Sequence, residues 1–288
     1  MVDKDSTDKV LEQKLEDILS DFEGESGVYV YHLKNNAEVA INADKIFPTA
    51  SMIKVPIMMT LFNKIEKGEL GYNDKVVYKD SLFYSGDDIL GSFKDGEEIA
   101  LSKLVMLMIT MSDNTASLWC QQIAGTGIEI NKYLIQAGMK KTRINSRTPG
   151  REDDWEKYGW GQTTAREMAS LVKKIGEGKA IAKAASEEMY KVMGNIYWNS
   201  EALSQIPPQI ATASKQGAVS QSRSEVVMVN APSGDYVFCV LTNHQQDTSW
   251  EHDNAGYQLI RDVSRILWEH FEPKHPYDPL KGSEKYYK

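Results

Sequence analysis

The chain has little cysteine and no long apolar run, and both absences limit what the protein can be. Only Cys120 and Cys239 occur among its 288 residues. Two cysteines so far apart exclude a disulfide scaffold and are expected to be thiols of the core. No run approaches the roughly 18 consecutive apolar residues that a membrane-spanning helix needs, so we expect no membrane partner.

The N terminus, Met1–Ser6, is polar and lacks the apolar centre of a signal peptide. We therefore expect either a cytoplasmic protein or, if a leader has been removed, a periplasmic or secreted one. The 33 Lys and Arg residues are outnumbered by 41 Asp and Glu residues, and the formal net charge is −8. That balance argues against binding to nucleic acid or to an anionic membrane surface. No spacing of His, Cys and Asp is typical of a metal site, and we expect no metal and no cofactor.

The order of the predicted elements indicates an α+β fold. Apolar residues at helical spacing or in alternation predict a helix over 7–22, strands over 27–33 and 38–41, a helix-rich centre, strands over 213–219, 225–229 and 236–241, and a last helix over 253–271. Strands from both chain ends are expected to form one antiparallel sheet covered by the terminal helices.

This layout predicts two lobes. Residues 1–50 and 205–272 would form an α/β lobe, residues 51–204 a central all-helical lobe, and residues 273–288 an extended tail. The active site would lie in the cleft between the lobes.

The centre contains three apolar helical segments and one polar stretch. The helices are expected over Leu101–Met111, Thr115–Ile123 and Thr164–Ile175, the last with Thr163 or Thr164 as its N-cap. Ser146–Gln162 is polar and is expected to be a long functional loop.

Three short motifs carry the candidate chemistry. Ser51 and Lys54 are three residues apart at the start of an apolar run, so a helix would place them on one face, one turn apart. A lysine whose pKa is lowered by burial can take the proton of a serine hydroxyl and make it a nucleophile. Ser112-Asp113-Asn114 follows in a turn between two helices, and Lys215-Gln216-Gly217 lies on a predicted strand.

In this order, the three motifs resemble those of class A β-lactamases and penicillin-binding proteins. The string Ile109-Thr110-Met111-Ser112-Asp113-Asn114-Thr115-Ala116 is similar to the corresponding family segment almost letter for letter. The separations between the motifs also match, and the resemblance covers roughly residues 20 to 270. It implies a serine hydrolase that acts on a small-molecule substrate, a β-lactam or a peptide or ester. We expect a monomer, because nothing in the sequence demands more.

The resemblance also implies catalytic roles, residue by residue. Ser51 would be the nucleophile that forms an acyl-enzyme, and Lys54 its base or a positioning cation. Ser112 resembles the hydroxyl that passes a proton to the leaving nitrogen. Asn114 resembles the residue that binds the substrate amide and orients Lys54, and Lys215 would supply positive charge for the substrate carboxylate.

Further residues of the third motif would bind substrate. The oxyanion hole would consist of the backbone N–H groups of Ser51 and Ala218. Gly217 would let the strand approach the substrate closely. Arg223 resembles the family arginine that assists carboxylate binding. Gln216 stands where the family usually has a Thr or Ser hydroxyl, so the substrate preference is expected to differ.

The polar stretch departs from the family more strongly. Class A β-lactamases carry a glutamate there that activates the deacylating water. Counted back from Thr163, the position of that glutamate falls on Pro149 and that of the following asparagine on Asp153. Either Glu152, Asp153, Asp154 or Glu156 takes its place in a refolded loop, or these acids form only a solvated surface.

Four functions therefore remain open at the level of the sequence. The first is β-lactam hydrolysis through a Ser51 acyl-enzyme. The second is a D-Ala-D-Ala peptidase, amidase or esterase with slow or no β-lactam deacylation. The third is a protein that binds the acyl group without turnover, and the fourth is the same fold without catalysis, against which the intact motifs argue.

Overall fold

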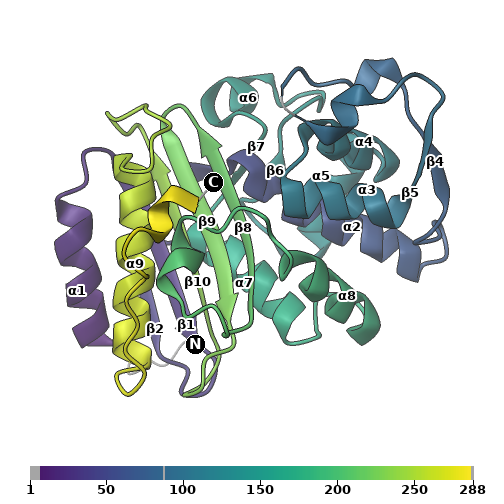
Figure 1. Ribbon diagram of the computed structural model, residues 1–288. Helices are drawn as coiled ribbons and strands as arrows, with labels where there is room; N and C mark the ends of the chain where they lie inside the picture. The colour runs from purple at the N-terminus through teal and green to yellow at the C-terminus, as the bar shows by residue number, and fades with distance from the viewer. Residues whose placement is uncertain (1–6, 87, 287–288) are drawn as a thin grey trace. The chain divides into compact units, whose positions relative to one another are not determined.

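The computed structural model describes residues 7–86 and 88–286 (Figure 1). The polar residues 1–6 and the last two residues of the predicted tail lie outside the described residues. The chain forms two compact units. We call Met1–Met52, Thr163–Lys173 and Trp198–Lys288 the sheet unit, and Ile53–Gln162 and Lys174–Tyr197 the helical unit. In the described ranges, no helix combines the length and the apolar character needed to cross a bilayer.

The sheet unit is built on a five-stranded antiparallel sheet. Its strands follow the spatial order β2 (Glu38–Ile41), β1 (Glu25–His32), β10 (Tyr236–Asn243), β9 (Ser222–Val229) and β8 (Thr212–Val219). In the central pair, Val28 lies opposite Val240. This pairing joins the two ends of the chain and confirms the predicted antiparallel sheet.

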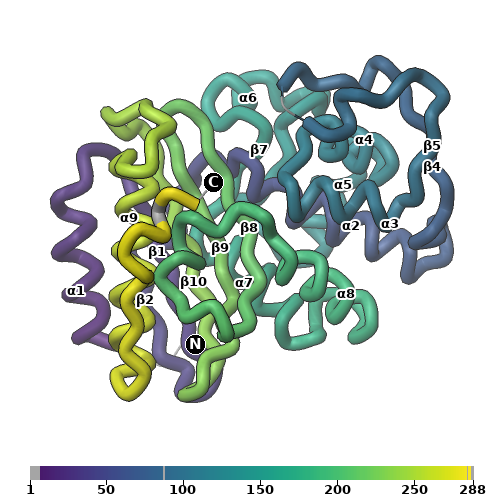
Figure 2. The backbone as a smooth tube through the Cα atoms, in the orientation of Figure 1, coloured from purple at the N-terminus to yellow at the C-terminus, as the bar shows by residue number. Residues whose placement is uncertain are grey.

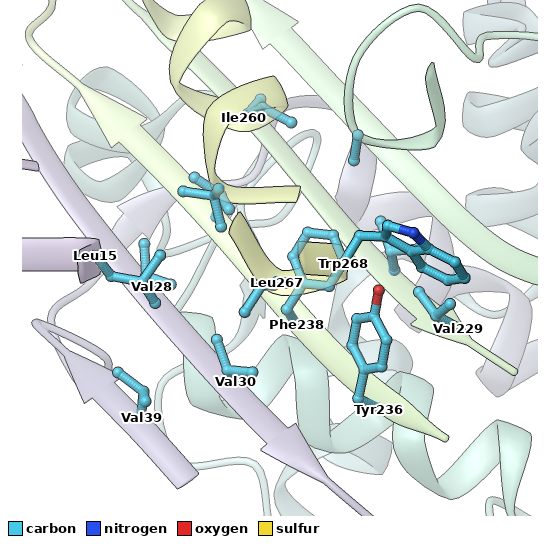
Figure 3. Close-up of a cluster of buried hydrophobic side chains, with 14 of the residues drawn as sticks. Leu15, Val28, Val30, Val39, Val229, Tyr236, Phe238, Ile260, Leu267 and Trp268 are labelled. Carbon is cyan, nitrogen blue, oxygen red and sulfur yellow. The ribbon is translucent and has the colours of Figure 1, made fainter. Parts of the chain in front are cut away.

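Two helices cover one face of this sheet, α1 (Lys9–Ser20) and α9 (Ala255–Phe271) (Figure 1). Asp8 caps the first and Asn254 caps the second through side-chain oxygens that accept backbone N–H bonds. The core between helices and sheet contains Leu15, Val28, Val30, Phe238, Leu267 and Trp268, all at most 1% exposed (Figure 3). Burial of such side chains stabilises the fold by about 1.5–3 kcal/mol each.

A further helix of the sheet unit starts where the sequence predicts it. In α7 (Ala165–Gly176), the N-cap is Thr164, because its Oγ1 accepts the N–H of Glu167 at 3.1 Å. Short elements complete this unit: β3 (Phe47–Pro48), η1 (Ala50–Ile53), η5 (Ala202–Gln205) and η6 (Ser283–Tyr286).

The elements of the helical unit are α2 (Lys54–Glu66), β4 (Lys75–Val77), η2 (Asp80–Leu82), η3 (Ile89–Ser92), β5 (Glu98–Ala100), α3 (Leu101–Met106), η4 (Leu107–Met111), α4 (Asn114–Ile123), α5 (Thr126–Gln136), β6 (Arg143–Ile144), α6 (Glu152–Tyr158), β7 (Gly161–Thr163) and α8 (Lys183–Met193). In the helical unit, α2 is buried from Lys54 to Phe62 and packs against α4, α5 and α8. The sequence analysis did not predict the short β4–β5 pair.

The predicted helix over 101–111 is two helical segments. After α3, the chain widens into η4, a single π-helical turn. Such turns are rare and occur mainly at functional sites. Here η4 leads directly into Ser112, the first residue of the second motif.

Candidate active site

Ser51 and Lys54 lie on one continuous helical stretch. Ser51 belongs to η1, and Lys54 is the first residue of α2, which follows without a break. Pro56 is tolerated because it stands in the first turn of α2, where backbone N–H groups have no helical acceptor. The helical spacing that the first motif predicted is therefore present.

Lys54 is the centre of a buried polar cluster in the helical unit. Its side chain is 0% exposed. The amine donates to the backbone oxygen of Ser112 at 2.5 Å, to Ser112 Oγ at 3.1 Å and to Asn114 Oδ1 at 2.8 Å. The structure thus brings together three of the predicted site residues.

The turn that holds Ser112 and Asn114 is fixed by Asp113. Asp113 Oδ1 accepts the N–H of Ala116 at 2.7 Å and caps α4, while Oδ2 accepts the N–H of Leu90 at 2.9 Å. Ser112 itself has a left-handed backbone with φ of 59°. Such strain in a residue other than glycine persists only where the surroundings enforce it, and it is typical of functional sites.

Burial sets the protonation of Lys54. Removal from water disfavours the ammonium form and lowers the pKa of Lys54 to about 7, although the carboxylates of Asp88 and Asp113 oppose the shift. Burial also raises the pKa of Asp113. A substantial fraction of Lys54 is therefore a neutral amine near neutral pH and able to accept a proton.

Lys215 lies on β8 in the sheet unit and is 0% exposed. Its amine donates to the backbone oxygen of Gln216 at 3.0 Å and to Gln216 Oε1 at 3.0 Å. Gln216 thus accepts hydrogen bonds from Lys215, the lysine of the same motif.

Gly217 allows β8 to pass close to the segment that carries Ser51. A Cβ atom at Gly217 would lie 2.5 Å from the oxygen of Thr49 and 2.9 Å from the nitrogen of Ser51, so no larger residue fits. Ser224 Oγ donates to the oxygen of Thr49 at 3.3 Å on the same side. Ala218 follows on β8, and its role with Ser51 as an oxyanion donor stays a prediction.

Arg223 is buried, and its contacts are with the protein itself. The guanidinium donates to backbone oxygens of Val219, Ser222 and Ser249, and it stacks between the rings of Trp250 and Tyr257 at 4.5 and 4.6 Å. Carboxylate binding by Arg223 stays a prediction.

The stretch Ser146–Gln162 is not an unbroken loop, and this part of the sequence analysis was wrong. The chain turns through α6 and returns as β7 (Figure 2), and β7 pairs with β6. The acids Glu152, Asp153 and Asp154 make up the first turn of α6, where negative charge favours a helix. The run of acids is thus a helix start that the sequence analysis did not recognise.

A hydrogen-bonded network, which we call the Arg151 network, holds this segment together. The guanidinium of Arg151 donates to Asn145 Oδ1 at 2.8 and 3.0 Å and to Gln162 Oε1 at 2.7 Å. It also pairs with Asp154 at 3.0 Å, and Asn145 and Gln162 are buried. The sequence analysis gave no role to Arg151 or to its two amide partners, because they lie 6 and 11 residues away along the chain and no short motif marks the set.

Glu152 and Asp153 are two of the four acids that the sequence analysis considered for deacylation. Both are exposed on α6, and Glu152 Oε1 accepts the N–H of Gly150 at 3.1 Å. A part in deacylation stays a prediction for both residues.

Comparisons with known proteins agree with the motifs. The sequence model of the Beta-lactamase enzyme family matches residues 9–271. The β-lactamase VEB-1 of Pseudomonas aeruginosa is 21% identical over 270 residues, which cover 90% of this chain and 89% of the relative. The β-lactamase BRO-1 of Moraxella catarrhalis is 22% identical over 273 residues, covering 90% and 85%.

Solved structures give the same result. The structure of PBP-A is 26% identical, covers 93% of this chain and 97% of its own, and superposes with a TM-score of 0.83. A β-lactamase from Sphaerobacter thermophilus is 22% identical with a TM-score of 0.80, covering 92% and 98%. The chain therefore belongs to the Beta-lactamase enzyme family and is a hydrolase of the β-lactamase and penicillin-binding protein fold.

Proposed function

We propose that the protein is a serine hydrolase that opens β-lactam rings through an acyl-enzyme on Ser51. Ser51 Oγ attacks the lactam carbonyl, its proton passes to the neutral amine of Lys54, and the C–N bond then breaks. Ser112 Oγ relays a proton from Lys54 to the leaving nitrogen. The backbone N–H groups of Ser51 and Ala218 stabilise the oxyanion, a contribution of about 3–4 kcal/mol per donor in comparable sites.

One observation carries this proposal. Lys54 is fully buried, is held by Ser112 and Asn114, and has a pKa lowered to about 7. Burial disfavours the ammonium form of Lys54, so the amine is able to accept a proton near neutral pH. A general base needs a pKa near the working pH. Lys54 has such a pKa, and it follows Ser51 by three residues on one helical stretch.

The substrate carboxylate would be met by Lys215 and Gln216. Because Gln216 Oε1 already accepts a bond from Lys215, its amide nitrogen is the group able to donate to a carboxylate. Gly217, which has no side chain, would let the substrate approach β8 closely. Arg223 would add positive charge behind the strand.

Turnover of a chromogenic cephalosporin tests this function. The wild-type protein is expected to open the ring with a measurable steady-state rate, and Ser51→Ala is expected to lose that activity entirely. Ser81→Ala serves as the matched control, since Ser81 is an exposed serine of η2. Equal rates in wild type and Ser51→Ala would contradict the proposal.

A second candidate is favoured by the segment Asn145–Gln162. Pro149 stands at the position of the family glutamate, and the nearby acids Glu152 and Asp153 are exposed on α6. A protein of this kind would acylate on Ser51 and release the acyl group slowly, as a D-Ala-D-Ala peptidase, amidase or esterase does with β-lactams. The likeness to PBP-A points in the same direction.

A burst experiment distinguishes the two candidates. Rapid release of one equivalent of chromophore followed by a slow phase supports the second, and a linear trace with many turnovers supports the first. A trace without burst or turnover would exclude both.

A further inference from the structure

A segment of the helical unit that is distant in sequence holds the turn of the second motif. The N–H of Tyr84 donates to Thr115 Oγ1 at 3.1 Å, and the N–H of Leu90 donates to Asp113 Oδ2 at 2.9 Å. Asp88 Oδ2 accepts the N–H of Thr115 at 2.8 Å and its hydroxyl at 3.2 Å. We call these four hydrogen bonds the Asp88 clasp.

The Asp88 clasp meets the motif on both sides of Asn114. Its bonds end on Asp113, the residue before Asn114, and on Thr115, the residue after it. Asn114 Oδ1 in turn accepts the bond from the amine of Lys54 at 2.8 Å. Thr115 is 0% exposed, so its polar groups depend on partners within the protein. The clasp therefore fixes the backbone that carries a partner of Lys54.

Two carboxylates together cap the start of α4. The first N–H groups of a helix have no acceptor within the helix, and negative charge is favourable beside them. Asp113 Oδ1 accepts the N–H of Ala116, while Asp88 accepts that of Thr115, the second residue of the helix. Asp113 is the N-cap, whereas Asp88 lies 27 residues away from Thr115 along the chain. Asp88 thus fixes where the start of α4 lies relative to its own segment.

Asp88 also acts on the charge of Lys54. Asp88 and Asp113 are two carboxylates of the helical unit that oppose the effect of burial on Lys54 and favour its ammonium form. Burial, and to a smaller extent the charge of Asp88, raise the pKa of Asp113. Asp88 therefore bears on the protonation of the proposed base as well as on the position of its partner Asn114.

We propose that Asp88 is a positioning residue of the acylation site, which acts through Thr115 to hold Asn114 in place against Lys54. The link to acylation rests on the proposed function, whereas the clasp does not. Because Asn114 binds the amine of Lys54, a shift in the start of α4 would move the base away from its working position. A displacement of about 1 Å at a reacting group can cost about 10²-fold in rate.

Two variants of Asp88 separate its hydrogen bonds from its charge. Asp88→Ala removes the acceptor of Thr115, and the rate of acylation by a penicillin should fall roughly 10–100-fold. Asp88→Asn keeps an oxygen that accepts the N–H, so it should recover most of that rate. Asp80→Ala, at an exposed acid that begins η2, is the matched control and should acylate at the wild-type rate. A wild-type rate in Asp88→Ala, or an equal loss in both Asp88 variants, would overturn the proposal.

The pH profile of acylation is a readout that a purely structural role would not move. Without the negative charge of Asp88, the ammonium form of Lys54 is less favourable and the pKa of Lys54 falls below about 7. The neutral amine is then present at lower pH, so the midpoint of the profile in Asp88→Asn should move to lower pH. This measurement keeps the proposal falsifiable if Asp88→Ala folds poorly. An unmoved midpoint would contradict the effect of Asp88 on the charge of Lys54.

Amide exchange measured by NMR tests the clasp without any activity. Exchange of the Thr115 N–H should be about tenfold or more faster in Asp88→Ala than in wild type, and should change little in Asp80→Ala. Exchange in α8 serves as the internal reference for global folding. Unchanged exchange of Thr115 in Asp88→Ala would overturn the clasp. A wild-type protein that is not acylated would fail the proposed function, while faster exchange in Asp88→Ala would still support the clasp.

Discussion

Two hydrogen-bonded regions of the helical unit, the Lys54 cluster and the Arg151 network, differ in how far short motifs mark them. The Lys54 cluster joins two short motifs, and its three members keep the residue types that the family has. The Arg151 network joins Asn145, Gln162 and Asp154. The groups that we propose for acylation come from short motifs, whereas no short motif marks the segment that we propose to govern deacylation.

We expect the largest effect from removing Lys54, the proposed base. Lys54→Ala should lower the rate of acylation by a penicillin roughly 10²–10⁴-fold, the usual contribution of a general base. Intact-protein mass spectrometry at short times measures this rate. The control is Lys103→Ala, an exposed lysine of α3, which should acylate at the wild-type rate. A Lys54→Ala variant that acylates within a few-fold of wild type would show that another group is the base.

The second prediction concerns the Arg151 network. Arg151→Ala leaves Asn145 Oδ1 and Gln162 Oε1 without their donor, and such losses cost about 1–3 kcal/mol for buried groups. We expect Tm to fall by several degrees and the acyl-enzyme lifetime to change, while the acylation rate stays near that of wild type.

Arg147→Ala is the matched control for this network. Arg147 is exposed and donates to a single backbone oxygen, that of Ser81, so its loss should change stability by less than about 0.5 kcal/mol. If both variants lower Tm equally, the network does not hold the segment. If Arg151→Ala abolishes acylation, the two regions are not separable.

The smallest effect is expected for the two exposed acids of α6. Glu152→Gln and Asp153→Asn should change the deacylation rate by no more than about twofold, because exposed charges contribute little. The decay of the acyl-enzyme mass measures this rate. A tenfold slower decay in either variant would identify a deacylating acid and bring the protein closer to the β-lactamases.

The sequence predicted the fold, and its short motifs named the three residues that the structure brings together in the Lys54 cluster. Alternating residues over 27–33 and the helical spacing over 7–22 correspond to β1 and α1, and the pairing of β1 with β10 follows from their apolar faces. Lys54, Ser112 and Asn114 were predicted from short motifs, whose separations match the family.

The sequence did not predict features that depend on contacts between distant residues. The acids Glu152 to Asp154 resemble a loop surface until α6 and its Arg151 partners are known. Glu225 was assigned to a strand, yet nothing in the string around it indicates that its buried carboxylate would accept the N–H of Ala202. Such buried polar pairs arise from tertiary packing, which overrides local pattern.

The most direct test of the account is the pH dependence of acylation on Ser51. Penicillin is mixed with the protein from about pH 6 to about pH 8, and the adduct is quantified by mass and mapped by peptide digestion. Because Lys54 must be neutral to accept the proton, the rate should rise about tenfold over this interval, with a single ionisation near pH 7 that is absent in Lys54→Ala. An adduct outside Ser51, or a rate on Ser51 that does not change with pH, would contradict the account.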